Sequence, residues 1–166
     1  MAGTTKRVIL RNAEATRELG RILGRSLPAG TVILLEGDLG SGKTTLVQGL
    51  GEGLGIQETI DSPTFTLINE YLDGRLPLYH IDLYRLTMKE AASLYLEAYW
   101  EGAEFPLGIM AIEWAERLPY PPENPLKISL KYGPEAGRQV ILTESNQAQT
   151  ELLEGLRVDE ILANEI

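Results

Sequence analysis

Apolar residues recur at helical spacing between Asn12 and Pro28, and this period predicts the first helix of the chain. Asn12 is a suitable N-cap residue, and Pro28 with the residues that follow it ends the segment. A short apolar run lies on either side of this helix. Residues 7–10 are expected to form a strand, and residues 31–36, rich in β-branched side chains, predict a buried strand.

A second helix is expected to begin at Thr44 and to fray or stop among the glycines that crowd positions 49–55. Further along, the runs 67–72 and 76–82 flank an Asp-Gly pair at 73–74, which is typical of a β-hairpin. A hairpin is antiparallel, so the sheet should be mixed rather than purely parallel.

The second half of the chain continues to alternate between helix and strand. Thr87 is a suitable cap for a helix that runs through Tyr99, and residues 107–112 predict another buried strand. Residues 126–132 and 138–143 predict a second hairpin with a longer connection. We therefore expect an α/β fold, a three-layer sandwich around a mixed parallel and antiparallel sheet.

The length of 166 residues fits one domain, which we expect to span residues 1–143. From Glu144 onward, six acidic residues stand against one basic residue, Arg157. The segment 144–166 is therefore expected to be an acidic tail that is helical or partly mobile.

The composition of the chain limits the kinds of partner, metal site and compartment that can be expected. The net charge of −9 argues against a broad electrostatic footprint on nucleic acid, so DNA is not an expected partner. No apolar stretch is long enough to suggest a membrane span. The chain has no cysteine, which excludes disulfides and thiolate metal sites and fits the reducing cytoplasm in which we expect the protein. A single histidine, His80, excludes a metal site built on several imidazoles and is more often a packed core residue.

The candidate chemistry begins with residues 37–44, which match the phosphate-binding loop G-x-x-x-x-G-K-[ST] at every fixed position. Glycines let successive backbone N–H groups converge on phosphate oxygens. Lys43 can reach the outer phosphates, and the Thr44 hydroxyl can ligate Mg²⁺. Because the loop lies between a predicted strand and a predicted helix, it predicts a nucleotide site.

Two acidic residues could serve such a nucleotide. Glu113 follows an apolar run that delivers it to a strand end, and Asp82 ends a second such run. We favour Glu113 as a metal ligand and Asp82 near the metal's water shell or the attacking water. The alternative is structural, in which each acid caps a helix or pairs with a nearby arginine such as Arg85.

The segment Ser62-Pro63-Thr64-Phe65 could fold over the γ-phosphate as switch segments do. The alternative is an ordinary turn with local hydroxyl hydrogen bonds. Trp114, beside Glu113, is more often a core or interface aromatic than a platform for a base.

Four motifs occur in order along the chain, at residues 37–45, 62–67, 80–86 and 112–114. This set resembles the TsaE family (formerly YjeE), small bacterial ATPases of tRNA threonylcarbamoyladenosine synthesis, over roughly residues 7–143. The resemblance implies a fold like that of the P-loop NTPases, with ATP or ADP and Mg²⁺ as its cofactors.

The resemblance also implies roles for individual residues. Thr44 and Glu113 would hold Mg²⁺, and Lys43, Asp82 and Thr64 would serve hydrolysis. The residues expected to bind the nucleotide are Asp38, Leu39, Gly40, Ser41, Gly42, Lys43, Thr44, Thr45 and Arg138.

Members of this family work with the proteins TsaD and TsaB, which transfer a threonylcarbamoyl group to the adenosine beside the anticodon. The resemblance thus implies that the chain binds this pair, meets tRNA only indirectly and resets the pair by hydrolysing ATP.

Three other functions share the phosphate loop. A phosphotransferase usually has an arginine-bearing lid, yet residues 71–85 contain only Arg75 and Arg85. A GTP switch needs an Asn-Lys-x-Asp stretch, which is absent after the loop. A binding module without useful turnover would differ from an ATPase only in whether hydrolysis matters.

Overall fold

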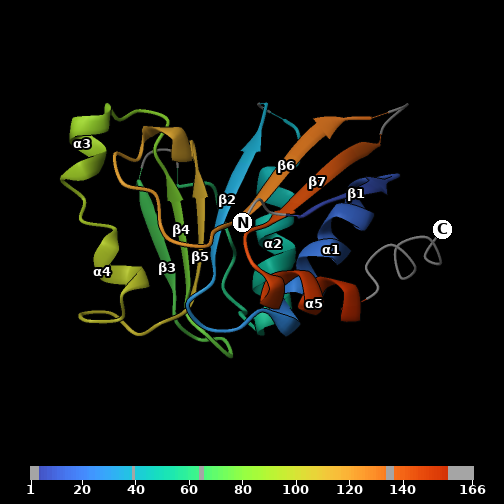
Figure 1. The fold of residues 1–166 in the computed structure, drawn as a ribbon, viewed down its shortest axis with the longest axis horizontal. Helices are drawn as coiled ribbons and strands as arrows, with labels where there is room; N and C mark the ends of the chain where they lie inside the picture. The colour runs from blue at the N-terminus through green and yellow to red at the C-terminus, as the bar shows by residue number, and fades with distance from the viewer. Residues whose placement is uncertain (1–3, 39, 64–65, 134–136, 157–166) are drawn as a thin grey trace.

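The structure is a computed structural model that describes residues 4–38, 40–63, 66–133 and 137–156. Within these ranges a seven-stranded sheet has the order β1-β7-β6-β2-β5-β4-β3 (Figure 1). The strands are β1 Thr4–Leu10, β2 Val32–Gly37, β3 Ile68–Tyr71, β4 Leu78–Asp82, β5 Ile109–Glu113, β6 Leu126–Tyr132 and β7 Arg138–Glu144. The helices are α1 Ala13–Ser26, α2 Lys43–Leu54, α3 Met88–Ala92, α4 Glu97–Trp100, the 3₁₀ helix η1 Ala115–Arg117 and α5 Gln147–Leu156.

The sheet is mixed, which confirms the predicted α/β class. Its centre is parallel: β2 lies between β6 and β5, and β5 pairs with β4. Both edges are antiparallel, with β3 on β4 at one side and β6, β7 and β1 at the other. The carboxyl ends of the parallel strands β2, β4 and β5 therefore lie side by side at one end of the sheet. Such strand ends are where α/β proteins build their ligand sites.

Each face of the sheet has its own apolar core, so the fold has three layers. On one face, buried side chains of α1, α2 and α5 pack against the strands. On the other face, α3, α4 and the segment after η1 cover the half of the sheet that contains β2, β5 and β4 (Figure 1). Strand alternation supplies both cores, because Leu78 of β4 joins the first and Tyr79 joins the second.

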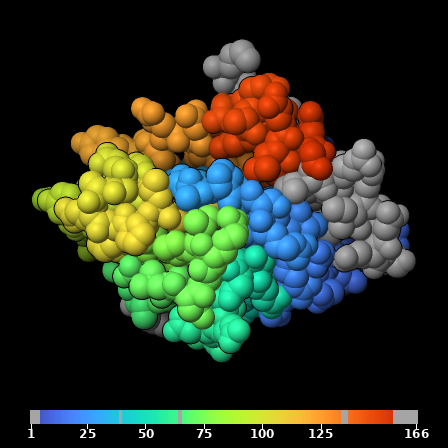
Figure 2. Space-filling view, turned by 90° about the horizontal axis from the view of Figure 1, so that it is seen from below, coloured from blue at the N-terminus to red at the C-terminus, as the bar shows by residue number. Residues whose placement is uncertain are grey.

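The end of the molecule opposite those carboxyl ends is closed by loop contacts, and Figure 2 views it from below. The Arg75 guanidinium donates to the carbonyls of Gly24 and Leu27 at 2.8 and 2.9 Å, and its backbone N–H bonds the Leu54 carbonyl. Gly30 N–H bonds the Gly108 carbonyl at 2.9 Å. These hydrogen bonds connect the loop between α1 and β2 with the loop between β3 and β4 and with the segment before β5.

The glycines that were expected to fray the second helix instead let it pack closely against α1. Helix α2 continues to Leu54, and Gly55, at φ +84°, is its C-cap. A Cβ on Gly49 would lie closer than 3.0 Å to the backbone of Arg17, and one on Gly53 would meet the Arg21 carbonyl. Gly55 therefore ends the helix as expected, but fraying at the earlier glycines was a wrong expectation. Helix propensity ignores a partner helix, and only glycine allows this backbone approach.

Two other expectations need correction. The helix expected from Thr87 to Tyr99 is two short helices, because Tyr95 between them adopts φ +51°. Thr87 itself is confirmed as a cap, in a reciprocal capping box with Glu90. The β3–β4 pair is antiparallel as predicted, but its connection is six residues long, 72–77, rather than a two-residue Asp-Gly turn.

The chain after β7 forms α5, whose Leu153 is buried in the first core. Glu144, expected to begin the tail, is the last residue of β7 and is itself buried. Among the described helices, none combines the length and the apolar character that crossing a membrane requires.

Candidate nucleotide and metal site

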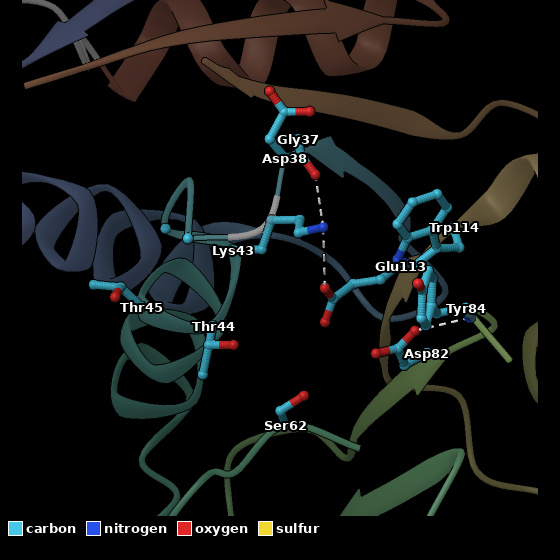
Figure 3. A pocket seen from close by; sticks show the side chains of 12 residues that line it. Gly37, Asp38, Lys43, Thr44, Thr45, Ser62, Asp82, Tyr84, Glu113 and Trp114 are labelled. Carbon is cyan, nitrogen blue, oxygen red and sulfur yellow. Dashed lines mark hydrogen bonds and ion pairs between the residues drawn. The ribbon is translucent and has the colours of Figure 1, made fainter. Parts of the chain in front are cut away.

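An open cavity of about 550 Å³ lies at the carboxyl ends of β2, β4 and β5 (Figure 3). Four parts of the chain contribute to it: the loop from β2 with the first turn of α2, the segment before β3, the end of β4 and the end of β5. Its lining consists of Gly37, Asp38, Gly40, Gly42, Lys43, Thr44, Thr45, Ser62, Asp82, Tyr84, Glu113 and Trp114. A pocket of this size is adequate for a nucleotide.

The loop owes its shape to glycines in left-handed conformations. Gly40 and Gly42 have φ of +79° and +109°, and Gly42 caps the start of α2. The first intrahelical bond runs from Leu46 N–H to the Gly42 carbonyl, so helical carbonyls do not engage the N–H groups of the three residues before Leu46. These N–H groups and the helix dipole suit an anion at this end of α2.

The hydroxyl of Ser41 is buried beneath the loop. Ser41 is 1% exposed, and its Oγ has no hydrogen-bond partner among the described residues. A Cβ on Gly37 would lie 2.5 Å from that oxygen. The loop is therefore a cradle that any side chain at position 37 would fill, with one buried polar group unsatisfied.

Lys43 bridges the loop and β5. Its ammonium donates to the Gly37 carbonyl at 2.7 Å and lies 3.6 Å from Oε1 of Glu113. The same nitrogen lies over the ring of Trp114, 5.5 Å from the ring centre, in a cation–π contact. Trp114 itself has a left-handed backbone, with φ +61°. The Lys43 charge is thus held at the cavity before any phosphate arrives.

The two predicted carboxylates are neighbours. Asp82 and Glu113 are opposite each other in the parallel β4–β5 register, and each is 5% exposed. Figure 3 shows Asp82 and Glu113 approaching the cavity from adjacent strand ends, with Thr44 and Ser62 across from them. Asp82 also has a local role, since its Oδ1 accepts a hydrogen bond from the backbone N–H of Tyr84 at 2.9 Å.

Arg138 lies at the back of the phosphate loop rather than in the cavity lining. Its Nε donates to the Ser41 carbonyl at 2.8 Å and its Nη2 to the Gly40 carbonyl at 3.2 Å. The guanidinium also stacks on Tyr132, 4.6 Å from the ring centre. Arg138 therefore holds the loop in shape from β7. The predicted residues Leu39 and Thr64 lie outside the described residues.

Sequence reasoning missed three contributors to the site. Tyr84 lines the cavity and packs against Trp114 with the rings tilted at 48° and 4.9 Å between ring centres. Trp114 lines the cavity as well, although it was expected to be a core or interface aromatic. His80, expected to be a packed residue, is fully buried and also contacts Glu113. The two-residue period, which places positions 80, 82 and 84 on one face, was the signal for His80 and Tyr84, and Trp114 had no such signal.

The oxygen atoms that line the cavity suit Mg²⁺ better than they suit a metal ion whose ligands all come from the protein. Thr44, Asp82 and Glu113 offer oxygen atoms, which hard cations prefer. In the ranges that the structure covers, no group of three or more His, Cys, Asp or Glu residues could hold a metal. Mg²⁺ typically takes one or two protein ligands and completes its shell with phosphates and water, so the residues present fit it.

Comparison with known proteins identifies the chain's relatives. The family model for the threonylcarbamoyl adenosine biosynthesis protein TsaE matches residues 10–140. The chain belongs to the TsaE family. Like others of this family, it is related to proteins of tRNA threonylcarbamoyladenosine biosynthesis, and the resemblance seen in its motifs is confirmed.

Individual relatives match over most of the chain. The tRNA threonylcarbamoyladenosine biosynthesis protein TsaE of Nostoc sp. is 58% identical over 147 residues, which cover 89% of this chain and 91% of the relative. The protein of the same name from Bacillus subtilis is 38% identical over 154 residues, covering 92% and 94%. The crystal structure of Bacillus subtilis YdiB superposes with a TM-score of 0.78 at 34% identity, covering 94% of this chain and 96% of that one.

Proposed function

We propose that this TsaE-family chain is a Mg²⁺-dependent ATPase that supports tRNA threonylcarbamoyladenosine synthesis. One observation carries the proposal: Lys43, the open amino end of α2 and the buried pair Asp82 and Glu113 line a single cavity. A cation, backbone donors and two carboxylates are the parts that phosphoryl-transfer sites share. ATP is preferred to GTP because the chain has no Asn-Lys-x-Asp stretch.

The chain's own residues have separable tasks. The N–H groups at the start of α2 bind the phosphates, and Lys43 leaves the Gly37 carbonyl to bind the outer phosphate oxygens. Thr44 and Glu113 would hold Mg²⁺, which when bound neutralises charge on the phosphate oxygens. Asp82 accepts a hydrogen bond from the attacking water, which orients it, and takes up its proton as general base. Lys43 must also separate from Glu113, so both change partners when the nucleotide binds.

The partners proposed for the chain are TsaD and TsaB. The described residues around the cavity include no arginine in the lining, so no residue of the lining supplies a second cation to the transferring phosphate. We therefore propose that the chain hydrolyses ATP slowly by itself and that hydrolysis becomes productive on the TsaD–TsaB pair. The chain would act in the cytoplasm and meet tRNA only through that pair.

A multi-turnover assay of tRNA modification tests this proposal. Purified TsaD and TsaB, together with TsaC, which acts upstream of them in this family, modify tRNA with and without the chain. The reaction contains ATP, or ATP supplemented with a non-hydrolysable analogue. We expect the chain to raise the number of turnovers and the analogue to abolish that increase. Equal turnover numbers with and without the chain would overturn the proposal, and an increase that survives the analogue would favour a binding module.

A further inference from the structure

His80 lies beneath the metal-binding edge of the site and has no role in the mechanism above. It is the only histidine of the chain and is 0% exposed. Its Nε2 lies 2.8 Å from Oε2 of Glu113. A carboxylate can only accept hydrogen bonds, so the shared hydrogen belongs to Nε2 and the imidazole is the donor.

The register of the two strands makes this contact possible. His80 is opposite Ala111, whereas Glu113 is opposite Asp82, so His80 reaches Glu113 diagonally across the β4–β5 pair. Ala111 is fully buried and has only a methyl group, which leaves room for the ring to lean along the strand. A bulky residue at position 111 would occupy the path of the imidazole.

The contact divides the two oxygens of Glu113 between the core and the cavity. His80 holds Oε2 on the buried side, and Oε1 lies 3.6 Å from the Lys43 ammonium at the cavity. When Lys43 turns to a phosphate, the Lys43 contact is lost while the His80 contact stays in place. Glu113 then keeps one oxygen facing the cavity in a fixed orientation.

We propose that His80 is a positioning residue that orients Glu113 for Mg²⁺. This inference rests on the proposed function, because it assigns His80 to the metal side of the nucleotide site. Hydrogen-bond donors behind a metal ligand fix its orientation, and removing them typically lowers metal affinity by about 10–100-fold. His80 itself would touch neither nucleotide nor metal.

A purely structural role is the competing explanation, and it makes a different prediction. Filling space beside Ala111 would affect the stability of the whole fold and the affinity for nucleotide with or without metal. Positioning Glu113 would affect only the part of nucleotide affinity that depends on Mg²⁺. The measured quantity is therefore the ratio of the ADP dissociation constant in EDTA to that in MgCl₂.

Three substitutions separate the explanations in calorimetric titrations with ADP. His80→Gln keeps an amide N–H at about the position of Nε2 and should preserve the ratio within about threefold of the wild type. His80→Asn keeps an amide that is too short to reach Glu113, and His80→Phe removes the donor. Both should reduce the ratio by about 10–100-fold while the dissociation constant in EDTA stays unchanged.

A matched control lies on the same strand. Tyr79→Phe deletes another side-chain hydrogen bond of β4, from the hydroxyl of the buried Tyr79 to the Pro106 carbonyl, on the opposite face. It should lower the stability of the fold without changing the ratio. Should His80→Phe fail to fold, the comparison of His80→Gln with His80→Asn decides the matter by itself.

The outcomes distinguish this inference from the proposed function. A wild-type chain that binds no ADP overturns both. A wild-type chain with Mg²⁺-dependent binding, together with His80→Asn and His80→Phe variants of unchanged ratio, overturns the positioning role alone. Equal losses in EDTA and in MgCl₂ also overturn it. In a Glu113→Ala background, His80→Phe should cause no further loss, because the residue that it positions is gone.

Discussion

Glu113 is the residue on which the polar contacts of the site converge. Lys43 approaches its Oε1, His80 holds its Oε2, and Asp82 lies beside it in the strand register. Glu113, His80 and Asp82 are buried and Lys43 is partly buried, so each needs the others to offset the loss of water. Substitutions here should therefore have large and separable effects on nucleotide binding and on hydrolysis.

Lys43→Ala should weaken ATP binding in the presence of Mg²⁺ by about 10–100-fold. A charge-assisted hydrogen bond contributes about 1.5–3 kcal/mol, and the variant leaves the phosphate charge without its cation. Calorimetric titration with ATP measures the change. Lys127→Ala, at an exposed position of β6, is the matched control and should bind as the wild type does. Equal affinities for the wild type and Lys43→Ala would remove Lys43 from the site.

Asp82→Asn should spare nucleotide binding and slow hydrolysis by roughly 10²–10⁴-fold, the usual range for loss of a general base. The amide oxygen can still accept the N–H of Tyr84, so the local turn is kept. Single-turnover hydrolysis and the ADP dissociation constant are the two measurements. Hydrolysis at the wild-type rate would show that Asp82 has only its structural contact.

At the scale of elements, the phosphate-loop helix is held in place by the helix beside it. Glycines at positions 20 and 24 of α1 and 49 and 53 of α2 let the two backbones approach closely. Ion pairs reinforce this contact at the surface, where Glu52 of α2 accepts hydrogen bonds from both Arg17 and Arg21. The amino end of α2 is thereby fixed relative to α1 before a ligand binds.

Gly49→Ala should lower the free energy of unfolding by about 1–3 kcal/mol, because the added methyl group collides with the backbone of Arg17 and neither helix can yield locally. Gly155→Ala in α5 is the matched control. A Cβ there meets nothing within 4 Å, so higher helix propensity should stabilise the fold by up to about 1 kcal/mol. Urea unfolding measures both. Stabilisation by Gly49→Ala would contradict the close approach.

At the scale of the whole molecule, one buried acid makes stability depend on pH. Glu144 is 2% exposed at the end of β7, and its Oε2 has no hydrogen-bond partner within the described chain. Burial raises the pKa of Glu144 above its ordinary value of 4.5, and Glu154 adds to the rise while Lys6 opposes it. The folded state therefore holds this proton at pH values where the unfolded chain has released it.

Glu144→Gln should stabilise the fold near neutral pH, with a benefit that grows as the pH rises above about 4.5 and levels off above the folded pKa. Below about 4.5 the carboxyl is protonated in both states, so the benefit should no longer change with pH. Urea unfolding of the variant and the wild type across this range measures the difference. Glu151→Gln, at an exposed position of α5, should show no such trend. A benefit independent of pH would contradict the assignment.

The local features of this protein were determined by its sequence alone. The phosphate loop, the Asn12 and Thr87 caps and the β3–β4 and β6–β7 pairs all depend on residues that are close together in the chain. For the same reason, the family could be inferred from four short motifs in order. Strand ends follow apolar runs, so the edge of the sheet that carries Asp82 and Glu113 could be predicted as well.

Only the tertiary structure decided how distant residues meet. The diagonal from His80 to Glu113 depends on the β4–β5 register, and the Arg138 contact with the loop joins residues almost a hundred positions apart. The glycines of α2 could be interpreted only with α1 beside them. Strand register and helix packing depend on the balance of all the buried contacts, so no single segment of the chain determines either of them.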